Sequence, residues 1–587
     1  MHGKRVVIVG GVAGGASAAA RARRLSEDAE IIVFERGPHV SFANCGLPYF
    51  AGGEIASRES LFIHTPDSLR ARFNLDVRVR TEVAAIDRAA RRVTVRELDS
   101  GCAYEQPYDA LVLAPGAEPL SPPIPGIGRE GHFAVRSVPD IERIMARIKD
   151  CPACRAVVVG GGYIGLEMTE QLTRRGLPVT VVEALPQVMS PLDPEMAAWL
   201  HEELRANGVR LRLNDPVAAF EPPLPGETAR ASVIVLRSGR RIEADLVILG
   251  LGVRPETALA KNAGLEIGAL GGIRVNERLR TNDPQIWAVG DAVEVRDRVT
   301  GAWALIPLAG PANRQGRIAA DNIFGRNSRY DGTWGTAILR LFKLTAACTG
   351  ANEKCLRQAG IAYEALHLHP NSHAGYYPGA EPIAMKILFA PDTGKLLGAQ
   401  AVGKDGVDKR IDVLATALQA GMAVHDLAAL ELAYAPPYGS AKDPVNLAGM
   451  AAQNVLAGDV ELAQWHELLG DRSSRRESAQ TSTDERVSGL TSAATNAESK
   501  AGQTESFLLL DVRNADERGK GCIPGSLHIP LGQLRARLGE LPKDREIIVH
   551  CQSGQRSYYA CRMLTQRGFR ARNLTGSYRT WKTAQGA

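Results

Sequence analysis

The sequence predicts a multidomain α/β protein, because one strand–turn–helix–strand pattern occurs in it twice. An apolar run at residues 6–9 leads into a glycine-rich turn at 10–15, an alanine-rich helix, and a second apolar run that ends at Glu35. The same order returns with a glycine-rich turn at 160–165 and a final acid at Glu183. Two parallel strands joined by a helix are the building unit of a doubly wound sheet, so we expect two Rossmann-like domains.

The length and composition indicate a soluble protein with several domains. The 587 residues exceed what one hydrophobic core supports. A net charge of +5 over this length gives no sign of a nucleic-acid surface, and no apolar run is long enough to cross a membrane. Because Met1 lies directly before the first apolar run, we expect no signal peptide and a cytoplasmic location.

The nine cysteines are too scattered to resemble a disulfide framework. Two of them, Cys151 and Cys154, have the spacing of a redox or zinc motif, but no second pair accompanies them. We therefore expect a loop without a special role at this position, and no bound metal.

The glycines in both turns have a physical role in binding a dinucleotide. They let the backbone approach a pyrophosphate, and the start of the following helix offers free N–H groups to it. The acid that ends each second strand, Glu35 or Glu183, can bind the hydroxyls of a ribose. Two such sites indicate two dinucleotides. Glu183 favours NADH, because it would repel the 2′-phosphate of NADPH; NADPH is the less favoured alternative, since Arg174 and Arg175 lie upstream on the helix.

Three further segments combine an apolar strand with glycine. Residues 111–117 and 246–255 are strands of the buried type that turn on glycine, as expected of crossovers between domains. Residues 281–292 place Asp291 just after Gly290, at an expected helix start.

A lone cysteine, Cys45, lies in the stretch at residues 41–49, ten residues after Glu35. If a helix starts near Cys45, its free N–H groups favour the thiolate, and Pro48 is tolerated that early in a helix. A redox-active thiol is therefore physically reasonable here. The alternative is a small buried apolar residue, which is the commonest role of a free cysteine.

Together, the glycine turns, the strand–glycine segments and the Asp291 segment resemble the flavoprotein disulfide reductases that bind two dinucleotides. The resemblance covers residues 1–460. It implies FAD in the first domain, with Asp291 on its ribityl chain, and a nicotinamide in the second. It also implies that residues 334–456, which lack such turns, form an α+β dimerisation domain. The implied cofactor-binding residues are Gly10, Gly11, Ala13, Gly14, Gly15, Glu35, Arg36, Asn44, Ala114, Pro115, Gly116, Gly160, Gly161, Gly162, Tyr163, Ile164, Gly165, Glu183, Gly252, Gly290 and Asp291.

The cysteines separate three subfamilies of these enzymes. Members with two active-site cysteines place them five residues apart, but Phe50 stands five residues after Cys45. Members that oxidise the cysteine to a sulfenic acid use a histidine at the position of Ala13. The stretches at 41–49 and 434–446 instead resemble the coenzyme A-disulfide reductases, in which a single cysteine forms a mixed disulfide with an exogenous thiol.

This closer resemblance gives roles to residues whose function the sequence otherwise leaves open. Tyr376 and Tyr434 lie in segments with nearby prolines, where aromatic side chains usually pack, but the resemblance implies that they reach the active site of the neighbouring subunit. The phosphates of coenzyme A suit the paired hydrogen bonds of arginine. Arg21 departs from the glutamine of the family pattern. The implied substrate-binding residues are Ser17, Arg21, Arg24, Ser41, Asn44 and Lys442.

The sequence predicts a separate small α/β domain in the C-terminal region. Residues 471–504 are rich in Ser, Thr, Asn and charged residues and predict a flexible linker. Beyond them, four residues separate Cys551 from Arg556, whereas phosphatases of related shape need five, so the spacing favours sulfur over phosphate. The domain resembles a rhodanese, which implies that loop N–H groups and Arg556 stabilise a thiolate or persulfide at Cys551. We expect Cys522 and Cys561 to be packing residues.

The whole chain thus resembles fusions of a coenzyme A-disulfide reductase with a rhodanese. The resemblance implies a homodimer that uses NADH and FAD to reduce persulfides, polysulfides or coenzyme A disulfide through Cys45, with coenzyme A as bound thiol or substrate. Tyr376 and Tyr434 would protonate or position the leaving sulfur, and Cys551 would exchange sulfane sulfur with the reductase across the linker. The alternatives are an NADH oxidase or peroxidase with a cysteine sulfenic acid, and a sulfur-relay or sensor scaffold with little turnover. We expect neither nucleic acid nor membrane as partner.

The predicted domain boundaries follow from these segments. They are residues 1–150 and 278–330 for FAD binding, 151–277 for NAD(H) binding, 331–465 for dimerisation, 466–504 for the linker and 505–587 for the rhodanese.

Overall fold

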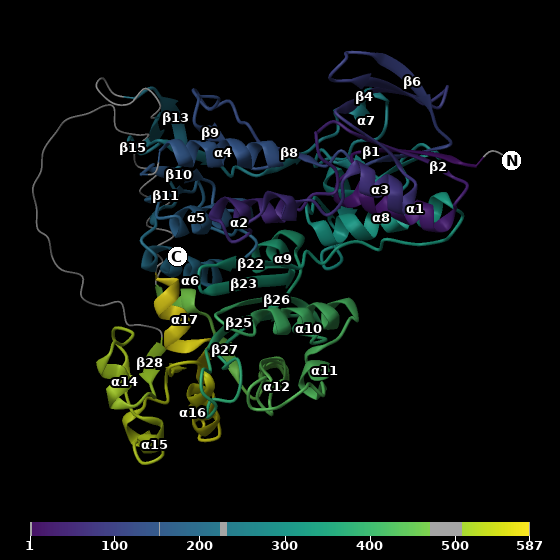
Figure 1. Cartoon of the computed structure of the whole chain (residues 1–587). Coiled ribbons are helices and arrows are strands. Elements are labelled where there is room, and N and C mark those ends of the chain that lie inside the picture. Colours follow the sequence, from purple (N-terminus) through teal and green to yellow (C-terminus); the bar gives the residue numbers. More distant parts are fainter. Residues whose placement is uncertain (1–2, 152, 224–231, 470–506, 586–587) are drawn as a thin grey trace, which may run out of the picture. The chain divides into compact units, whose positions relative to one another are not determined.

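The computed structural model describes residues 3–151, 153–223, 232–469 and 507–585 (Figure 1). The chain divides into two compact units, each of which is described by itself below. The first unit comprises Met1–Asp193 and Leu200–Ile361, and the second comprises Pro194–Trp199 and Ala362–Ala587. No helix of the described residues combines the length and the apolar character that crossing a bilayer requires.

The first unit begins with a parallel five-stranded sheet in the order β19-β7-β1-β2-β3. Val7 in the central strand lies beside Ile32 on one side and Leu111 on the other. The apolar runs form these strands because both faces of the sheet are covered. The elements are β1 Arg5–Val9, α1 Ala13–Leu25, β2 Glu30–Glu35, β3 Asp76–Val79, β7 Ala110–Leu113, β19 Ile286–Ala288 and α8 Ala309–Ile323, with α1 packed along α8.

A second parallel five-stranded sheet repeats this design in the order β12-β11-β10-β16-β9. The four residues of its central strand are all buried, as a parallel sheet requires. The prediction of two Rossmann-type domains is therefore confirmed. The elements are β9 His132–Phe133, α4 Val138–Asp150, β10 Ala156–Val159, α5 Tyr163–Arg174, β11 Val179–Val182, α6 Pro194–Ala206, β12 Arg210–Arg212 and β16 Leu246–Leu249.

Smaller elements complete the first unit. The two predicted strand–glycine segments continue into β8 Ala117–Pro119 and β17 Val253–Pro255, which pair with each other antiparallel. The others are α3 Pro66–Phe73, β4 Thr81–Asp87, β5 Arg92–Glu97, β6 Ala103–Pro107, β13 Val217–Glu221, β14 Ser232–Leu236, β15 Arg241–Ala244, α7 Ala258–Asn262, β18 Ile273–Arg274, β20 Val293–Arg296, β21 Trp303–Ala304, β22 Ala337–Leu341, β23 Leu344–Gly350 and α9 Glu353–Ala359.

The second unit contains an antiparallel arrangement of β24, β25 and β26, followed by three helices. These elements are β24 Glu364–Leu368, β25 Ile383–Phe389, β26 Leu396–Gly403, α10 Val407–Gln419, α11 Val424–Ala429 and α12 Pro444–Leu456.

The C-terminal part of the second unit is built on a parallel sheet in the order β27-β31-β30-β28-β29. Its edge strand β27, Glu461–Ala463, precedes the predicted linker, whereas the other strands follow it. The sequence placed these residues in the preceding domain, because a three-residue strand gives no signal of its partner. The other elements are β28 Phe507–Asp511, α14 Ala515–Gly519, β29 Leu527–His528, α15 Leu531–Leu534, β30 Glu546–His550, α16 Gln555–Thr565, β31 Ala571–Leu574 and α17 Ser577–Ala584.

The predicted linker at 466–504 begins inside regular structure. Trp465–Leu469 form a short 3-10 helix, η4, directly after β27. The rest of that stretch lies outside the described residues.

Candidate functional site

The first glycine turn has the close backbone packing that a dinucleotide cradle needs. Gly10 has φ +96°, and a Cβ placed there would lie 2.0 Å from the carbonyl oxygen of Ala114. A Cβ on Gly15 would lie 1.8 Å from the carbonyl oxygen of Gly10. Only glycine therefore fits at these two positions, and α1 starts within the glycine-rich turn, at Ala13, with no side-chain cap on its first N–H groups.

The acid at the end of β2 is fixed by the turn itself. One carboxylate oxygen of Glu35 accepts a hydrogen bond of 2.8 Å from the Gly11 N–H, and the other accepts one of 2.7 Å from the Gly37 N–H. This geometry holds the carboxylate at the carboxyl edge of the sheet, where a ribose would lie.

A cavity of 470 Å³ opens at this edge. Of the described residues that line it, Arg136 and Glu256 were missed by the sequence analysis; they form an ion pair of 2.9 Å, and their contact joins segments far apart in the chain. Burial raises the pKa of Asp291, and Arg136 partly offsets that rise. The predicted cofactor residues on the lining are Gly10, Ala13, Gly14, Glu35, Arg36, Asn44, Ala114, Pro115, Gly116, Gly290 and Asp291.

The second glycine turn has the same local hydrogen bonds as the first. The Glu183 carboxylate accepts a hydrogen bond of 2.6 Å from the Gly161 N–H and one of 2.8 Å from the Leu185 N–H. Glu35 accepts the equivalent bonds from Gly11 and Gly37. Gly160 has φ +106°, and a Cβ there would lie 2.1 Å from the carbonyl oxygen of Gly250. Gly162 caps α5, which carries Tyr163, Ile164 and Gly165 in its first turn, and Gly252 with φ +94° leads into β17. Both turns thus fit dinucleotides.

Cys45 lies in a short 3-10 turn, Asn44–Gly46, directly before helix α2, Leu47–Gly52. Its thiol is free and accessible, and its neighbour Asn44 lines the cavity. A backbone N–H at Cys45 lowers the pKa of its thiol, in the direction expected of a helix start, but other groups outweigh this effect. Partial desolvation by the surrounding protein, followed by the charges of Glu167 and Asp291, raises the pKa of Cys45.

Glu167 is a further candidate that the sequence analysis missed. It lies on α5, after the second glycine turn, and accepts a hydrogen bond of 3.1 Å from the Tyr49 hydroxyl. Burial raises the pKa of Glu167 to about 7. The Arg340 guanidinium lies over the Tyr49 ring, 5.2 Å from its centroid. The helix that carries the second glycine turn therefore brings a proton-holding carboxyl toward Cys45.

The predicted substrate residues on α1 already have protein partners on α8. The Ser17 hydroxyl donates a hydrogen bond of 2.6 Å to Asn313, and Arg21 forms an ion pair of 2.7 Å with Asp321. Arg24 is exposed, whereas Ser41 is buried, with φ +47°. In the second unit, Lys442 is exposed just before α12. Arg24 is consequently the α1 cation that is most accessible to an anion.

Tyr376 and Tyr434 form a pair within the second unit. Their hydroxyl oxygens are 2.9 Å apart, although the residues lie on separate loops. The two side chains are 77% and 48% exposed, so the alternative that they simply pack in a core is wrong. This hydrogen bond raises the pKa of Tyr376.

Cys551 follows β30 and lies in the loop before α16. The Gly554 N–H points to its sulfur at 3.1 Å, and the Ser557 hydroxyl lies 3.4 Å from it. Burial raises the pKa of Cys551, but hydrogen bonds from Ser557 and from the loop N–H groups outweigh it and leave the pKa lowered. Arg556 is held by Glu517 through two hydrogen bonds of 2.6 Å. Glu517 is a positioning partner that the sequence analysis missed.

The remaining cysteines give mixed outcomes. Cys561 is buried in the core of the C-terminal sheet, as expected, whereas Cys522 is exposed. Cys151 and Cys154 lie after α4, as expected of a loop, but they are joined by a disulfide that the sequence analysis did not predict.

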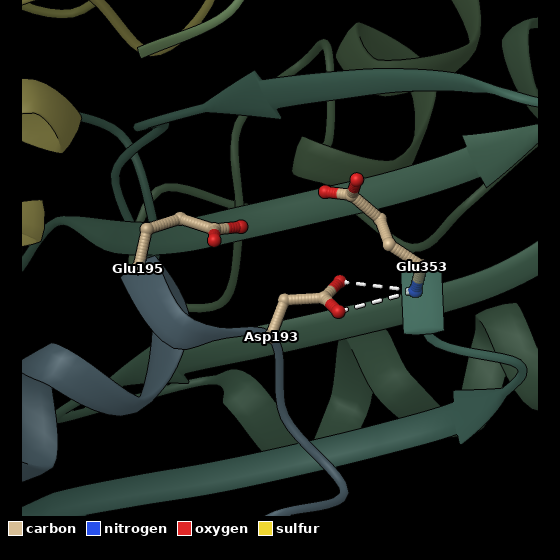
Figure 2. A group of neighbouring side chains, drawn as sticks. All are labelled: Asp193, Glu195 and Glu353. Carbon is tan, nitrogen blue, oxygen red and sulfur yellow. Dashed lines mark hydrogen bonds between the residues drawn. The ribbon is translucent and has the colours of Figure 1, made fainter. Parts of the chain in front are cut away.

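Figure 2 shows the carboxylates of Asp193, Glu195 and Glu353. Within the first unit, Asp193 accepts hydrogen bonds of 3.1 and 3.4 Å from the N–H of Glu353, the first residue of α9. Within the second unit, Glu195 accepts from Lys386 at 2.5 Å and lies 2.9 Å from His367. Asp193 and Glu195 therefore have protein donors, and we assign no metal to these acids.

Comparison with known families accounts for most of the chain. The sequence model of the pyridine nucleotide-disulphide oxidoreductases matches residues 4–316, that of their dimerisation domain matches 337–444, and that of the rhodanese-like domain matches 493–584. The FAD and NAD(H) expected of this family fit the two cradles described above.

Individual proteins resemble the chain over its reductase part or its whole length. The coenzyme A disulfide reductase of Staphylococcus haemolyticus is 35% identical over 453 residues, which are 77% of this chain and 100% of that protein. The protein in the crystal structure of reduced Bacillus anthracis CoADR-RHD is 46% identical in sequence and superposes with a TM-score of 0.90. The match covers 100% of this chain and 98% of that chain. An NAD-dependent persulfide reductase from A. fulgidus is 35% identical, with a TM-score of 0.86, over 98% of this chain and 100% of its own. The chain belongs to the pyridine nucleotide-disulfide oxidoreductases and carries a C-terminal rhodanese domain.

Proposed function

We propose that this protein uses NADH and FAD to reduce a persulfide or coenzyme A disulfide through the single thiol of Cys45. The observation that carries the proposal is an accessible free thiol whose neighbour Asn44 lines the FAD cavity. No second cysteine stands at position 50 to form an internal disulfide, and Ala13 offers no imidazole for peroxide chemistry. The bond to be reduced must therefore come from an exogenous sulfur compound.

The reaction starts at the Cys45 sulfur. Its thiolate attacks one sulfur of the substrate S–S bond, and the other sulfur leaves with the electron pair and takes a proton. FAD and NADH, when bound in the two cradles, would supply the two electrons needed to reduce the new S–S bond at Cys45. For each S–S bond broken, one NADH and one proton are consumed and two thiols form; for a persulfide, one of the two products is hydrogen sulfide.

Two groups are positioned to manage protons in this scheme. Glu167, whose pKa is about 7, holds or releases a proton near Cys45 at neutral pH. In a homodimer, the Tyr376–Tyr434 pair of a second protomer would protonate or position the leaving sulfur. The exposure of both tyrosines supports this role, because neither is used to fill the core of its own unit.

Coenzyme A is the substrate carrier that the α1 surface supports best. Arg24 is available for its phosphates, with Ser17 and Asn44 as further contacts, whereas Arg21 is engaged by Asp321 and Ser41 is buried. Glu183 favours NADH over NADPH, and an NADH-consuming reaction suits the cytoplasm.

The rhodanese domain would handle sulfane sulfur at Cys551. Its lowered pKa supplies a thiolate that can attack the outer sulfur of a donor, and the loop N–H groups would stabilise the persulfide that forms. This sulfur then passes to or from the reductase.

Anaerobic stopped-flow reoxidation of the NADH-reduced enzyme tests the proposal. Coenzyme A persulfide and coenzyme A disulfide are mixed with it separately, and flavin absorbance is followed. We expect reoxidation by at least one of them, and its loss in Cys45→Ser, with Cys102→Ser as a matched control at an exposed cysteine. No reoxidation by either compound, together with rapid oxygen consumption, would instead make the protein an NADH oxidase.

A further inference from the structure

Ser577 has an unusual backbone conformation next to the sulfurtransferase cysteine. It has φ +53°, follows Gly576 with φ +66°, and is fully buried at the start of α17. Positive φ in this region favours glycine, because a Cβ crowds the backbone there. A serine at this position therefore needs a reason, and its hydroxyl is the group that glycine lacks.

The hydroxyl of Ser577 lies in a closed ring of polar atoms around Cys551. It accepts a hydrogen bond of 3.1 Å from the Cys551 N–H and lies 3.1 Å from the hydroxyl of Ser557. The Ser557 hydroxyl in turn lies 3.4 Å from the Cys551 sulfur, whereas the Ser577 hydroxyl is 3.8 Å from it. The Ser577 hydroxyl also lies 3.1 Å from the Leu574 carbonyl oxygen, and when it donates to Ser557 instead, the proton of Ser557 is directed to the sulfur.

We propose that Ser577 is a positioning residue for sulfur transfer at Cys551, acting through Ser557 to keep a hydrogen bond on the reacting sulfur. Without the Ser577 hydroxyl, Ser557 is free to donate to the Gly554 carbonyl oxygen, which lies 3.0 Å away. The sulfur then loses one of the donors that stabilise its negative charge. This inference rests on the proposed role of Cys551.

The chemistry at stake is a transfer without net oxidation. The Cys551 thiolate attacks the outer sulfur of a donor such as thiosulfate, the S–S bond of the donor breaks, and sulfite leaves with the electron pair. Cys551 then carries a persulfide, and cyanide or a thiolate attacks its terminal sulfur and restores the Cys551 thiolate. Negative charge remains on sulfur at each stage, so a directed hydroxyl proton is useful throughout.

The turn before Ser577 is held by two strands, β24 and β27, that lie outside residues 493–584, the range matched by the rhodanese-like family. The Thr575 N–H donates a hydrogen bond of 2.9 Å to the carbonyl oxygen of Ala463 in β27. The Thr575 hydroxyl accepts a hydrogen bond of 2.7 Å from the N–H of His367 in β24. A Cβ on Gly576 would lie 2.9 Å from the His367 Cβ. These contacts hold the turn in the conformation that brings the Ser577 hydroxyl to Cys551.

Replacement of Ser577 by glycine removes the hydroxyl and keeps the positive φ, so it tests the hydroxyl alone. In the full-length holoenzyme, Ser577→Gly should still fold, because glycine accepts the positive φ, although the buried Cys551 N–H loses its side-chain acceptor and the unfolding temperature falls modestly. Its thiosulfate:cyanide transfer should fall about tenfold. The alkylation of Cys551 by iodoacetamide, measured against pH by peptide mass spectrometry, should shift its midpoint upward by about one pH unit.

Matched variants make the result specific. Asn214→Gly replaces another residue with positive φ, at +57° and far from this loop in the sequence, and should change neither readout. Ser577→Ala and Ser557→Ala should reproduce the loss seen in Ser577→Gly, and NADH-dependent reduction of small persulfides should be unchanged in all of them.

Two results would have different meanings. Parental transfer and an unshifted alkylation profile in Ser577→Gly would overturn the role of Ser577. A parent enzyme without transfer activity that depends on Cys551, judged by Cys551→Ala, would overturn the proposed function of the rhodanese domain instead.

Discussion

The Tyr49 hydroxyl donates a hydrogen bond of 3.1 Å to the carboxylate of Glu167. Tyr49 lies on α2, the helix that follows Cys45, and Glu167 lies on α5, the helix that follows the NADH-binding turn. The contact therefore links the segment of the redox thiol to the element that positions the electron donor. The negative charge of Glu167 also raises the pKa of the Cys45 thiol.

Removal of the Glu167 charge should make Cys45 easier to ionise. The carboxylate of Glu167 raises the pKa of Cys45, and the pKa of Glu167 itself is about 7, so its influence grows as the pH passes through 7. In Glu167→Gln, we expect the alkylation rate of Cys45 to rise between pH 7 and 9 and to lose its inflection near pH 7. Tyr49→Phe removes a hydrogen bond that lowers the pKa of Glu167, and should move that inflection upward. Identical profiles in all three proteins would contradict this coupling.

Glu167 should also make stability depend on pH. Its folded pKa of about 7 lies above its value in an unfolded chain, so the folded protein binds more protons between pH 4.5 and 7. The contribution of Glu167 therefore favours folding at low pH and is lost as the pH rises to 7. Guanidinium unfolding of the holoenzyme at pH 5.5 and 8 should show Glu167→Gln gaining stability relative to the parent at the higher pH. A gain at the lower pH would show that the sign is wrong.

The two strand-end acids should affect different cofactors. Glu35→Gln loses charge-assisted bonds to Gly11 and Gly37, and we expect about tenfold weaker FAD retention, measured by flavin absorbance after dialysis. Glu183→Gln should keep its flavin and raise the KM for NADH about tenfold. Each variant serves as the control for the other, and loss of flavin in both would indicate a general folding defect.

The two tyrosines should act as one unit. Because their hydroxyls are 2.9 Å apart, each phenol depends on the other for its hydrogen bond. We expect Tyr376→Phe and Tyr434→Phe each to lower kcat/KM for the persulfide about tenfold, and the double variant to be little worse than either. Tyr438→Phe, at a tyrosine 73% exposed nearby in the sequence, provides the control. Fully additive losses would argue against a joint role.

Glu517 should matter for sulfur transfer but not for NADH oxidation. Its carboxylate holds Arg556 through two hydrogen bonds, so Glu517→Gln frees the guanidinium from a fixed orientation. We expect about a tenfold loss of thiosulfate:cyanide transfer with unchanged flavin reoxidation. Glu540→Gln, which breaks an exposed ion pair with Arg537 in the same domain, should leave both activities intact.

Local patterns were sufficient to predict the two cofactor cradles. Gly15 and Gly165 are required by close contacts with the carbonyl oxygens of Gly10 and Gly160 in their own strand–turn–helix units, and Glu35 and Glu183 bond to N–H groups a short distance along the chain. Local patterns also singled out Cys45 and Cys551, and the resemblance to known families then gave both cysteines their expected roles.

Contacts between distant segments were not predictable from the sequence. Glu167, Glu517 and the Arg136–Glu256 pair carry no motif, because each acquires its role only when a remote segment folds against it. The net rise in the pKa of Cys45 could not be predicted for the same reason. A helix start can be read from neighbouring residues, but the carboxylates of Glu167 and Asp291 come from other elements of the fold.

Because β27 belongs to the C-terminal sheet, cleavage of the chain between residues 470 and 506 would not free the C-terminal domain. Glu461–Ala463 on one side of that stretch pair with Arg572–Leu574 on the other, and Arg562 and Arg572 add ion pairs to Asp459 and Glu467. A protease that cleaves there would leave two polypeptides whose shared sheet is intact. The C-terminal fragment should then remain bound to its other half through a purification, as a complemented pair rather than a released domain.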